Sequence, residues 1–190
     1  AKAKEGEGLL IHGGTSGIGV MGLQIAKALG LKTFTTVGSQ EKLDFIEEHQ
    51  LAKGINYKET AFEEAFKNDK IDVILDMVGG DYTQKNLELL NTKGRLIHIN
   101  GMKSLTPQIN LWTMMSKQLI LSGSLLKPQP IIVKERIAEE VKEKVWPLLA
   151  SGQVKPIVHK VFKLEEAAKA HQLMESSAHI GKIILENSAS

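Results

Sequence analysis

Cysteine is absent from the 190 residues of this chain. Its absence excludes disulfide bonds, zinc–thiolate sites, iron–sulfur clusters and a cysteine nucleophile. An excess of charge is also missing, because 24 Lys and Arg face 22 Asp and Glu and leave a net charge of +2. Aromatic residues make up only 5% of the chain. Balanced charge and few aromatics argue against a dedicated nucleic-acid surface.

Long apolar runs are missing as well. No run approaches the length of a membrane span, and no signal peptide is visible, so the cytoplasm is the default location that we expect. Hydrophobic residues nevertheless make up 42% of the chain, which excludes disorder over its whole length. The chain is long enough for one globular domain with a full-sized core.

Short apolar segments alternate with segments of helical spacing along most of the chain. Nearly continuous apolar strands in such an alternation indicate a doubly wound α/β fold, in which a parallel sheet is covered on both faces and binds ligands at the carboxyl ends of its strands. We expect this Rossmann domain to span residues 1–186, followed by a tail at 187–190. The expected strands lie at 9–12, 33–37, 54–57, 71–77, 95–99, 117–125, 158–162 and 181–185. The expected helices lie at 20–29, 40–50, 60–66, 81–90, 111–116, 131–150 and 164–175.

The strongest motif is the loop at 13–19, within the stretch HGGTSGIG between the first strand and the first helix. Glycines there let the backbone turn tightly and approach a pyrophosphate, while the new helix points free N–H groups at the phosphates. Thr15 and Ser16 can add hydroxyl hydrogen bonds. The loop therefore predicts nucleotide binding, and the alternative is a tight turn without a ligand.

The end of the second strand predicts the choice of cofactor. Domains that bind NAD place Asp or Glu there, about 20 residues after the glycine-rich loop. This chain has Ser39 instead, and Ser39 with Lys42 can bind a 2′-phosphate through a hydroxyl and a positive charge. We therefore expect NADP, although Glu41 is adjacent. In the alternative interpretation, Ser39 only caps a helix and Lys42 is solvated.

The loop sequence is also compatible with a short-chain dehydrogenase. Those enzymes need a Tyr with a Lys four residues later as an acid–base pair. Tyr57 is followed at that spacing by Ala61, and Tyr82 by Asn86, so neither tyrosine forms the pair. The Asn-Ala-Gly signature of that family is missing too. The short-chain interpretation remains a weak alternative.

Most of the chain resembles the cofactor-binding domain of the zinc-independent, zeta-crystallin-like quinone oxidoreductases of the medium-chain dehydrogenase/reductase superfamily. The resemblance rests on LLIHGGTSGIGVMGLQIAKALG, VGSQEKLDF, GINYKE, IDVILDMVGG, GRLIHINGM and AAKAHQLMESSAHIGKIILE. These segments follow the order and spacing of the family from about residue 5 to residue 186. One departure is Ser16, which stands where the family usually has the middle glycine of the loop.

The resemblance implies a set of cofactor contacts. Two of these residues have a purely structural alternative: Tyr57 could be a packing residue at a strand end, and Gly79 could be part of a turn that ends a strand. The implied pyrophosphate residues are Ser16, Gly17 and Ile18, and those of the 2′-phosphate are Ser39, Lys42 and Tyr57. Val78 and Gly79 would approach the adenine and ribose, and Asn100, Gly101, Met102, Ser124 and Leu125 would lie near the nicotinamide.

The resemblance also implies hydride transfer from NADPH to a quinone or an α,β-unsaturated carbonyl, without zinc. In the family, a GroES-like catalytic domain precedes the cofactor domain, and we expect that domain to be absent from this chain. We therefore assign no catalytic residue, expect little turnover from this chain alone, and expect the strand at 181–185 to return to the other domain. His12 and His98, at strand ends, are expected to pack rather than to act as acid–base groups.

The apolar segment at 117–125 is expected to be a long edge strand. Unpaired edges invite partners, and in the resembled family this part of the sheet joins a second subunit. We therefore expect a homodimer, with residues 111–115 adding contacts. The alternative is a monomer in which the helix from Ile131 covers the strand. A non-catalytic nucleotide- or RNA-binding module remains a weaker alternative for the function.

Overall fold

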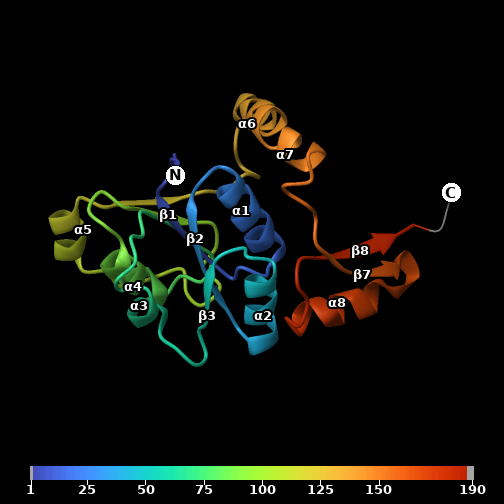
Figure 1. Cartoon of the computed structure of the whole chain (residues 1–190), viewed down its shortest axis with the longest axis horizontal. Coiled ribbons are helices and arrows are strands. Elements are labelled where there is room, and N and C mark those ends of the chain that lie inside the picture. The colour runs from blue at the N-terminus through green and yellow to red at the C-terminus, as the bar shows by residue number, and fades with distance from the viewer. Residues whose placement is uncertain (1, 188–190) are drawn as a thin grey trace.

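A computed structural model describes residues 2–187; of the expected tail, only Asn187 lies within the described residues. Six parallel strands form one sheet in the order β3-β2-β1-β4-β5-β6, which confirms the doubly wound fold (Figure 1). After β1 the chain adds β2 and β3 on one side of that strand, and it then crosses back and adds β4, β5 and β6 on the other side. A switch point therefore lies between β1 and β4. The strands are β1 Gly8–His12, β2 Lys32–Val37, β3 Lys53–Asn56, β4 Val73–Asp76, β5 Arg95–His98 and β6 Ile120–Gly123.

Helices cover both faces of the sheet because alternate side chains of each strand point to opposite faces. Leu10 packs into one core with Phe62 and Phe66, whereas its neighbour Ile11 packs into a second core with Leu23. The first core lies under α3 and α4, and the second lies under α1 and α2. These helices are α1 Gly17–Ala28, α2 Gln40–Glu48, α3 Phe62–Ala65 and α4 Asp81–Leu89.

The first helix begins at Gly17, three residues before the predicted start. Ser16 is its N-cap, and the Ser16 hydroxyl accepts a hydrogen bond from the Gly19 N–H at 3.0 Å. A serine cap satisfies one of the free N–H groups of the first turn, so glycines that we assigned to the loop can belong to the helix. The predicted loop at 13–19 is therefore wrong at its end.

The long edge strand predicted at 117–125 is also wrong. Lys117 ends the helix α5 (Leu111–Lys117), Gln118 has a left-handed backbone with φ 53°, and β6 holds four residues only. The Lys117 ammonium donates to the Leu90 carbonyl at 2.9 Å and to the Glu88 carbonyl, at the end of α4. A lysine that satisfies terminal helix carbonyls is fixed by tertiary structure, which the apolar pattern does not report.

The helix predicted at 131–150 is divided in two. The helix α6 covers Ile131–Lys144, and α7 covers Trp146–Ala150. Pro147 has no N–H to donate, so the helix cannot continue through it without losing a hydrogen bond. Within the described residues, no helix is long and apolar enough to cross a membrane.

The last part of the chain forms a second, two-stranded parallel sheet. The strand β7 (Val158–Lys163) pairs with β8 (Lys182–Glu186), and η1 (Leu164–Glu166) with α8 (Ala167–Glu175) connects them. This unit lies beside α2 and apart from the six-stranded sheet (Figure 1). Ile180 packs into the core under α1 and α2, so the unit is anchored on that face.

Candidate cofactor site

The glycine-rich loop turns at the carboxyl end of β1. Gly13 and Gly14 donate their N–H groups to the Thr36 carbonyl at 3.0 and 3.2 Å, which ties the loop to β2. At Gly19, a Cβ atom would lie 2.2 Å from the Gly13 carbonyl oxygen, so only glycine fits there. The loop therefore depends on glycine at a position inside the first turn of α1.

The first turn of α1 offers donors to an anion. The N–H groups of Gly17 and Ile18 have no hydrogen-bond acceptor among the described residues, and the turn has no acidic residue. Free N–H groups and the positive end of the helix dipole favour negative charge. This turn is therefore suited to an anion, and the role of Ser16, Gly17 and Ile18 in binding a pyrophosphate stays a prediction. Thr15, by contrast, is buried, and its hydroxyl does not face solvent.

Ser39, Lys42 and Tyr57 lie together where β2 and β3 end side by side, and we call them the phosphate cluster. The Tyr57 hydroxyl lies against the backbone of Gly38, where an added Cβ would be 2.8 Å from it. Ser39 caps α2 by accepting from the Lys42 N–H at 3.4 Å. The structure thus brings together the three residues that we expected to meet a 2′-phosphate.

The Lys42 side chain reaches the unit formed by β7, α8 and β8. Its ammonium donates to the Ser177 carbonyl at 2.6 Å. Burial lowers the pKa of Lys42, because removing the ammonium from water disfavours its charged form, while Glu41 acts in the opposite direction. A partly desolvated cation held by one neutral carbonyl is a favourable partner for a phosphate.

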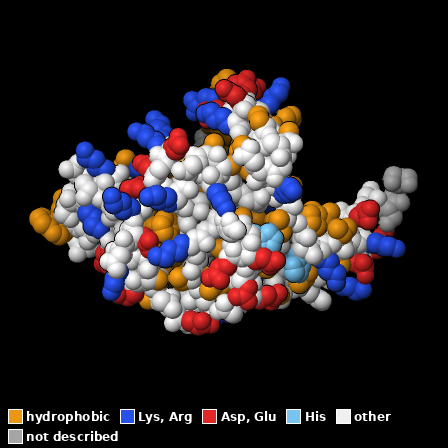
Figure 2. Space-filling view, viewed as in Figure 1, with side chains coloured by type: hydrophobic (Ala, Val, Ile, Leu, Met, Phe, Trp, Pro, Cys, Tyr) orange, Lys and Arg blue, Asp and Glu red, His pale blue; other side chains and the backbone are white. Residues whose placement is uncertain are grey.

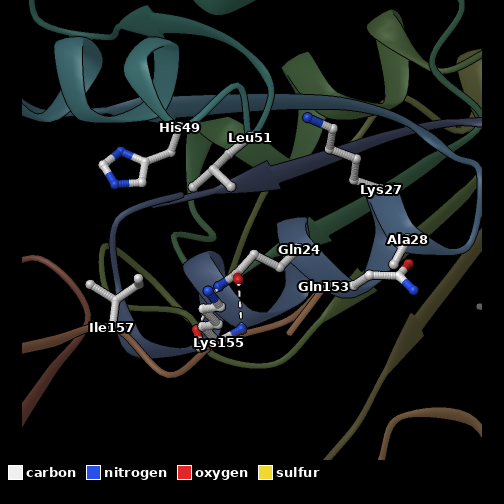
Figure 3. Close-up of a pocket in the computed structure, with 8 residues that line it drawn as sticks. All are labelled: Gln24, Lys27, Ala28, His49, Leu51, Gln153, Lys155 and Ile157. Atoms are coloured by element: carbon white, nitrogen blue, oxygen red, sulfur yellow. Dashed lines mark hydrogen bonds between the residues drawn. The ribbon is translucent and has the colours of Figure 1, made fainter. Parts of the chain in front are cut away.

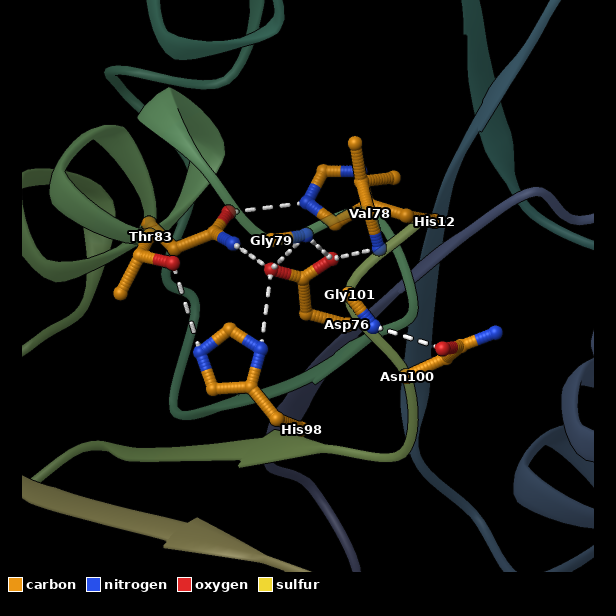
Figure 4. A network of polar contacts seen from close by, with 9 residues as sticks. His12, Asp76, Val78, Gly79, Thr83, His98, Asn100 and Gly101 are labelled. Carbon is orange, nitrogen blue, oxygen red and sulfur yellow. Dashed lines mark hydrogen bonds and ion pairs between the residues drawn. The ribbon is translucent and has the colours of Figure 1, made fainter. Parts of the chain in front are cut away.

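Beneath the loops of β4 and β5 lies a network of polar side chains, shown in Figure 4. Asp76 is fully buried, and its carboxylate accepts from the Val78 N–H at 2.6 Å and from the Gly79 N–H at 3.3 Å. The same carboxylate fixes the backbone of both residues that we expected near the adenine and ribose. Gly79 has a φ of +67°, which favours glycine.

The rest of this network joins β1 to β5 through α4. Asn86 donates to Asp76 at 3.1 Å, so its amide oxygen faces the Nε2 of His12 at 2.8 Å. Asp76 also lies 3.4 Å from the Nδ1 of His98. We call this set the buried network, and its members are His12, Thr36, Asp76, Thr83, Asn86 and His98.

The buried network fixes the chemical state of His12. Asp76 accepts from the amide of Asn86, so the amide oxygen must accept from Nε2–H of His12. Nδ1 of His12 then accepts from the Thr36 hydroxyl at 3.0 Å. Burial lowers the pKa of His12, which keeps the imidazole neutral. The expected packing role of His12 agrees with this geometry.

A cavity of about 600 Å³ opens between the ends of β5 and β6. Four of the five residues that we expected near the nicotinamide line this cavity, together with Thr83 and His98 of the buried network. These four are Asn100, Gly101, Ser124 and Leu125. Gly79, which we expected near the adenine and ribose, lines the same cavity. Met102 does not line the cavity and is 74% exposed.

A second cavity, of about 470 Å³, lies away from the carboxyl ends of the strands, beside the C-terminal half of α1 (Figure 3). Gln24 joins α1 to the segment before β7, because its side chain exchanges two hydrogen bonds with the Lys155 backbone, at 2.8 and 3.0 Å. None of the predicted site residues lines this cavity. We interpret it as the space beside a structural contact, and its lining residues are Gln24, Lys27, Ala28, His49, Leu51, Gln153, Lys155 and Ile157.

A glycine-rich loop that starts a helix at the carboxyl edge of such a sheet defines a dinucleotide-binding domain of the Rossmann class. Residues 50–185 match the model of the family described as zinc-binding dehydrogenase. The chain belongs to this family of medium-chain dehydrogenases and reductases, and the short-chain alternative is therefore wrong. Within residues 2–187, no group of three His, Asp or Glu side chains could hold a metal ion.

Known members of the family share this domain. The chain is 32% identical to a quinone oxidoreductase of Rattus norvegicus, over 97% of this chain and 56% of the relative. It is 29% identical to an acryloyl-coenzyme A reductase of Metallosphaera sedula, over 97% of this chain and 52% of the relative. The quinone oxidoreductase of Thermus thermophilus, solved also in complex with NADPH, matches with a TM-score of 0.84 and 27% identity, over 98% of this chain and 60% of that chain. The chain thus spans little more than half the length of these relatives.

Proposed function

We propose that this chain is the NADPH-binding domain of an oxidoreductase that reduces a quinone or an α,β-unsaturated carbonyl. The observation that carries the choice of NADPH is the phosphate cluster. Domains that prefer NAD place a carboxylate at this strand end, whereas this chain has Ser39, Lys42 and Tyr57 there. The relatives named as quinone oxidoreductase and acryloyl-coenzyme A reductase support the class of acceptor.

Different residues at the carboxyl ends of the strands would bind different parts of the cofactor. The first turn of α1 would bind the pyrophosphate through its free N–H groups, and Lys42 would pair with the 2′-phosphate. The loop that Asp76 holds would take the adenine and ribose, and the cavity near Asn100 and Ser124 would take the nicotinamide. NADPH supplies a hydride when it is bound, and the protein supplies position and electrostatics.

The proposal assigns no metal ion and no acid–base residue to this chain. A quinone or an enone is already electrophilic, so it accepts a hydride without a metal to polarise it. Because the chain spans about half of its relatives, the acceptor would be held largely by residues outside it. We therefore propose that this domain binds NADPH but turns over little by itself. As a separate point, we propose that the whole enzyme acts in the cytoplasm.

We also propose that the domain forms a homodimer through β6 and α5. Ile120 on the edge strand is 57% exposed, and Leu111, Trp112 and Met115 on α5 are 63%, 71% and 64% exposed. Figure 2 shows apolar side chains gathered at the tip of the molecule that α5 forms. Sedimentation of the wild type and of Trp112→Glu at equal concentration tests this proposal, and we expect the variant to be monomeric.

Calorimetric titration of this chain with NADPH, and separately with NADH, tests the cofactor assignment. We expect a clear preference for NADPH. Equal affinity for both cofactors, or a preference for NADH, would contradict the role given to the phosphate cluster. Binding of neither cofactor would overturn the proposal for this chain as an independent binding domain.

A further inference from the structure

The start of β8 lies on the glycine-rich loop, although the two segments are at opposite ends of the chain. The Gly181 N–H donates to the Thr15 carbonyl at 2.8 Å, and Gly181 is buried with a φ of +78°. The Lys182 N–H donates to the Ile157 carbonyl at 2.8 Å. These contacts fix the backbone of Lys182 beside the first turn of α1.

The Lys182 side chain then extends across Gly17. A Cβ atom added to Gly17 would lie 2.5 Å from the Lys182 Nζ and 2.7 Å from its Cε. The ammonium therefore stands over the first residue of α1, where the N–H groups of Gly17 and Ile18 lack acceptors among the described residues. A positive charge beside the positive end of a helix is unfavourable unless an anion lies between them.

Lys182 also lacks a partner of its own. It is exposed, and within residues 2–187 it forms no side-chain hydrogen bond or ion pair. Other lysines of the unit differ, because Lys169 pairs with Glu166 at 2.8 Å. An unpaired ammonium that a fixed backbone holds over free N–H groups is suited to bind a doubly charged oxyanion.

We infer that Lys182 is a pyrophosphate ligand, which the last strand contributes to the cofactor site opposite the N–H groups of Gly17 and Ile18. This inference rests on the proposed function, because it assumes that a dinucleotide binds at the loop. It assigns separate phosphates to two lysines: Lys42 to the 2′-phosphate and Lys182 to the pyrophosphate. Gly17 has a second purpose under this assignment, since any side chain there would displace the lysine.

The test measures the affinity of three ligands by calorimetry for wild type, Lys182→Gln, Lys42→Gln and Lys163→Gln. NADPH carries both phosphate groups, NADH carries only the pyrophosphate, and adenosine 2′-monophosphate carries only the 2′-phosphate. Lys163→Gln is the matched control, because Lys163 is exposed at the far end of the same strand pair. All four proteins are compared at one ionic strength, since phosphate binding depends on salt.

We expect Lys182→Gln to weaken NADPH and NADH alike, by about tenfold, and to leave adenosine 2′-monophosphate within about twofold of wild type. Lys42→Gln should show the reverse pattern, weakening NADPH and adenosine 2′-monophosphate while sparing NADH. The control should bind all three ligands as wild type does. Because Lys182 is exposed and unpaired, its variant should unfold at the wild-type temperature.

Two results would overturn the inference, and both differ from failure of the proposed function. If wild type binds NADPH and NADH but Lys182→Gln binds both equally well, Lys182 is no ligand. If Lys182→Gln weakens all three ligands equally, the lysine acts through the fold or through general charge. Failure of wild type to bind any dinucleotide would instead remove the proposed function itself.

Discussion

The buried network and the phosphate cluster lie at the same edge of the sheet and use similar side chains, but their polar atoms are satisfied differently. In the buried network, the Asp76 carboxylate meets two backbone N–H groups, Asn86 and His98, and it is fully shielded from water. In the phosphate cluster, Tyr57 is 45% exposed and the Lys42 ammonium is held by a single carbonyl.

This difference separates residues that hold the backbone of the site in place from residues that can bind the ligand. A buried carboxylate with all its partners supplied by the protein has no capacity left for a ligand, so its effect is to hold the loops of β4 and β5. A cation with few protein partners can exchange them for a phosphate at little cost. Substitutions in the first region should therefore change stability, and those in the second should change affinity.

The largest effect is expected for Asp76→Ala. Its four donors would lose an acceptor that is fully buried, so we expect the free energy of unfolding to fall by about 3–5 kcal/mol. Urea denaturation measures this loss. Glu47→Ala, at an exposed site on α2, should change the stability by less than about 0.5 kcal/mol. A loss below about 1 kcal/mol for Asp76→Ala would contradict the structural role of the network.

Lys42→Ala should act on affinity alone. Loss of a charge-assisted hydrogen bond to a phosphate should weaken NADPH by about 10- to 100-fold. NADH lacks that phosphate, so its affinity should not change. Calorimetry measures both affinities. An equal loss for the two cofactors would show that Lys42 stabilises the structure of the site and does not bind the 2′-phosphate.

Ser39 belongs to both kinds of residue, and two substitutions separate its roles. Ser39→Ala removes the N-cap of α2 and should cost about 1 kcal/mol of stability. Ser39→Asp keeps a capping oxygen but adds a negative charge beside the 2′-phosphate, so it should preserve stability and weaken NADPH relative to NADH. Thermal unfolding and calorimetry on the same samples measure the two effects. Equal stability of the two variants would contradict the cap.

The smallest effect is expected for an ion pair outside both regions. Glu7 receives two hydrogen bonds from the Arg95 guanidinium, at 2.7 and 2.9 Å, and Arg95 lowers the pKa of Glu7 to about 2. Because this pKa is lower in the folded state, the pair stabilises the fold above pH 4.5, and its contribution is lost as the pH falls towards 2.

Glu7→Gln should therefore reduce stability by no more than about 1 kcal/mol at pH 7. The difference between wild type and variant should shrink as the pH falls and vanish near pH 2. Urea denaturation at several pH values measures it. A difference that stays constant with pH would show that the carboxylate charge is not its source.

The phosphate cluster could be predicted from the sequence because local rules place its members. Ser39 and Lys42 follow β2 directly, Tyr57 follows β3, and parallel neighbouring strands end at the same edge. The glycine-rich loop followed in the same way from a strand and a helix that are adjacent in sequence. The family and its doubly wound fold are confirmed, because the motifs follow the order and spacing of the family over most of the chain.

The buried network and Lys182 could not be predicted, because their contacts depend on distant segments. Asp76 interrupts an apolar strand and gives no local sign that Asn86 and His98 will contact it. The sequence also did not show that Lys117 would bind the end of α4, so an apolar stretch suggested a strand that is too long. In each case the deciding contact joins residues that only the tertiary structure brings together.

The hydrogen bond from Gly181 to Thr15 has a consequence for the order of folding. It closes one of the longest loops that this chain can form, and such closure carries a large entropic cost that later contacts must repay. The strands β1 to β6 can pair before that closure, whereas the glycine-rich loop reaches its final surroundings only afterwards. The carboxyl edge of the sheet, where we propose that the cofactor binds, would thus reach its final structure in the last stage of folding. Amide hydrogens of β8 should therefore exchange with solvent sooner than those of β1 and β4.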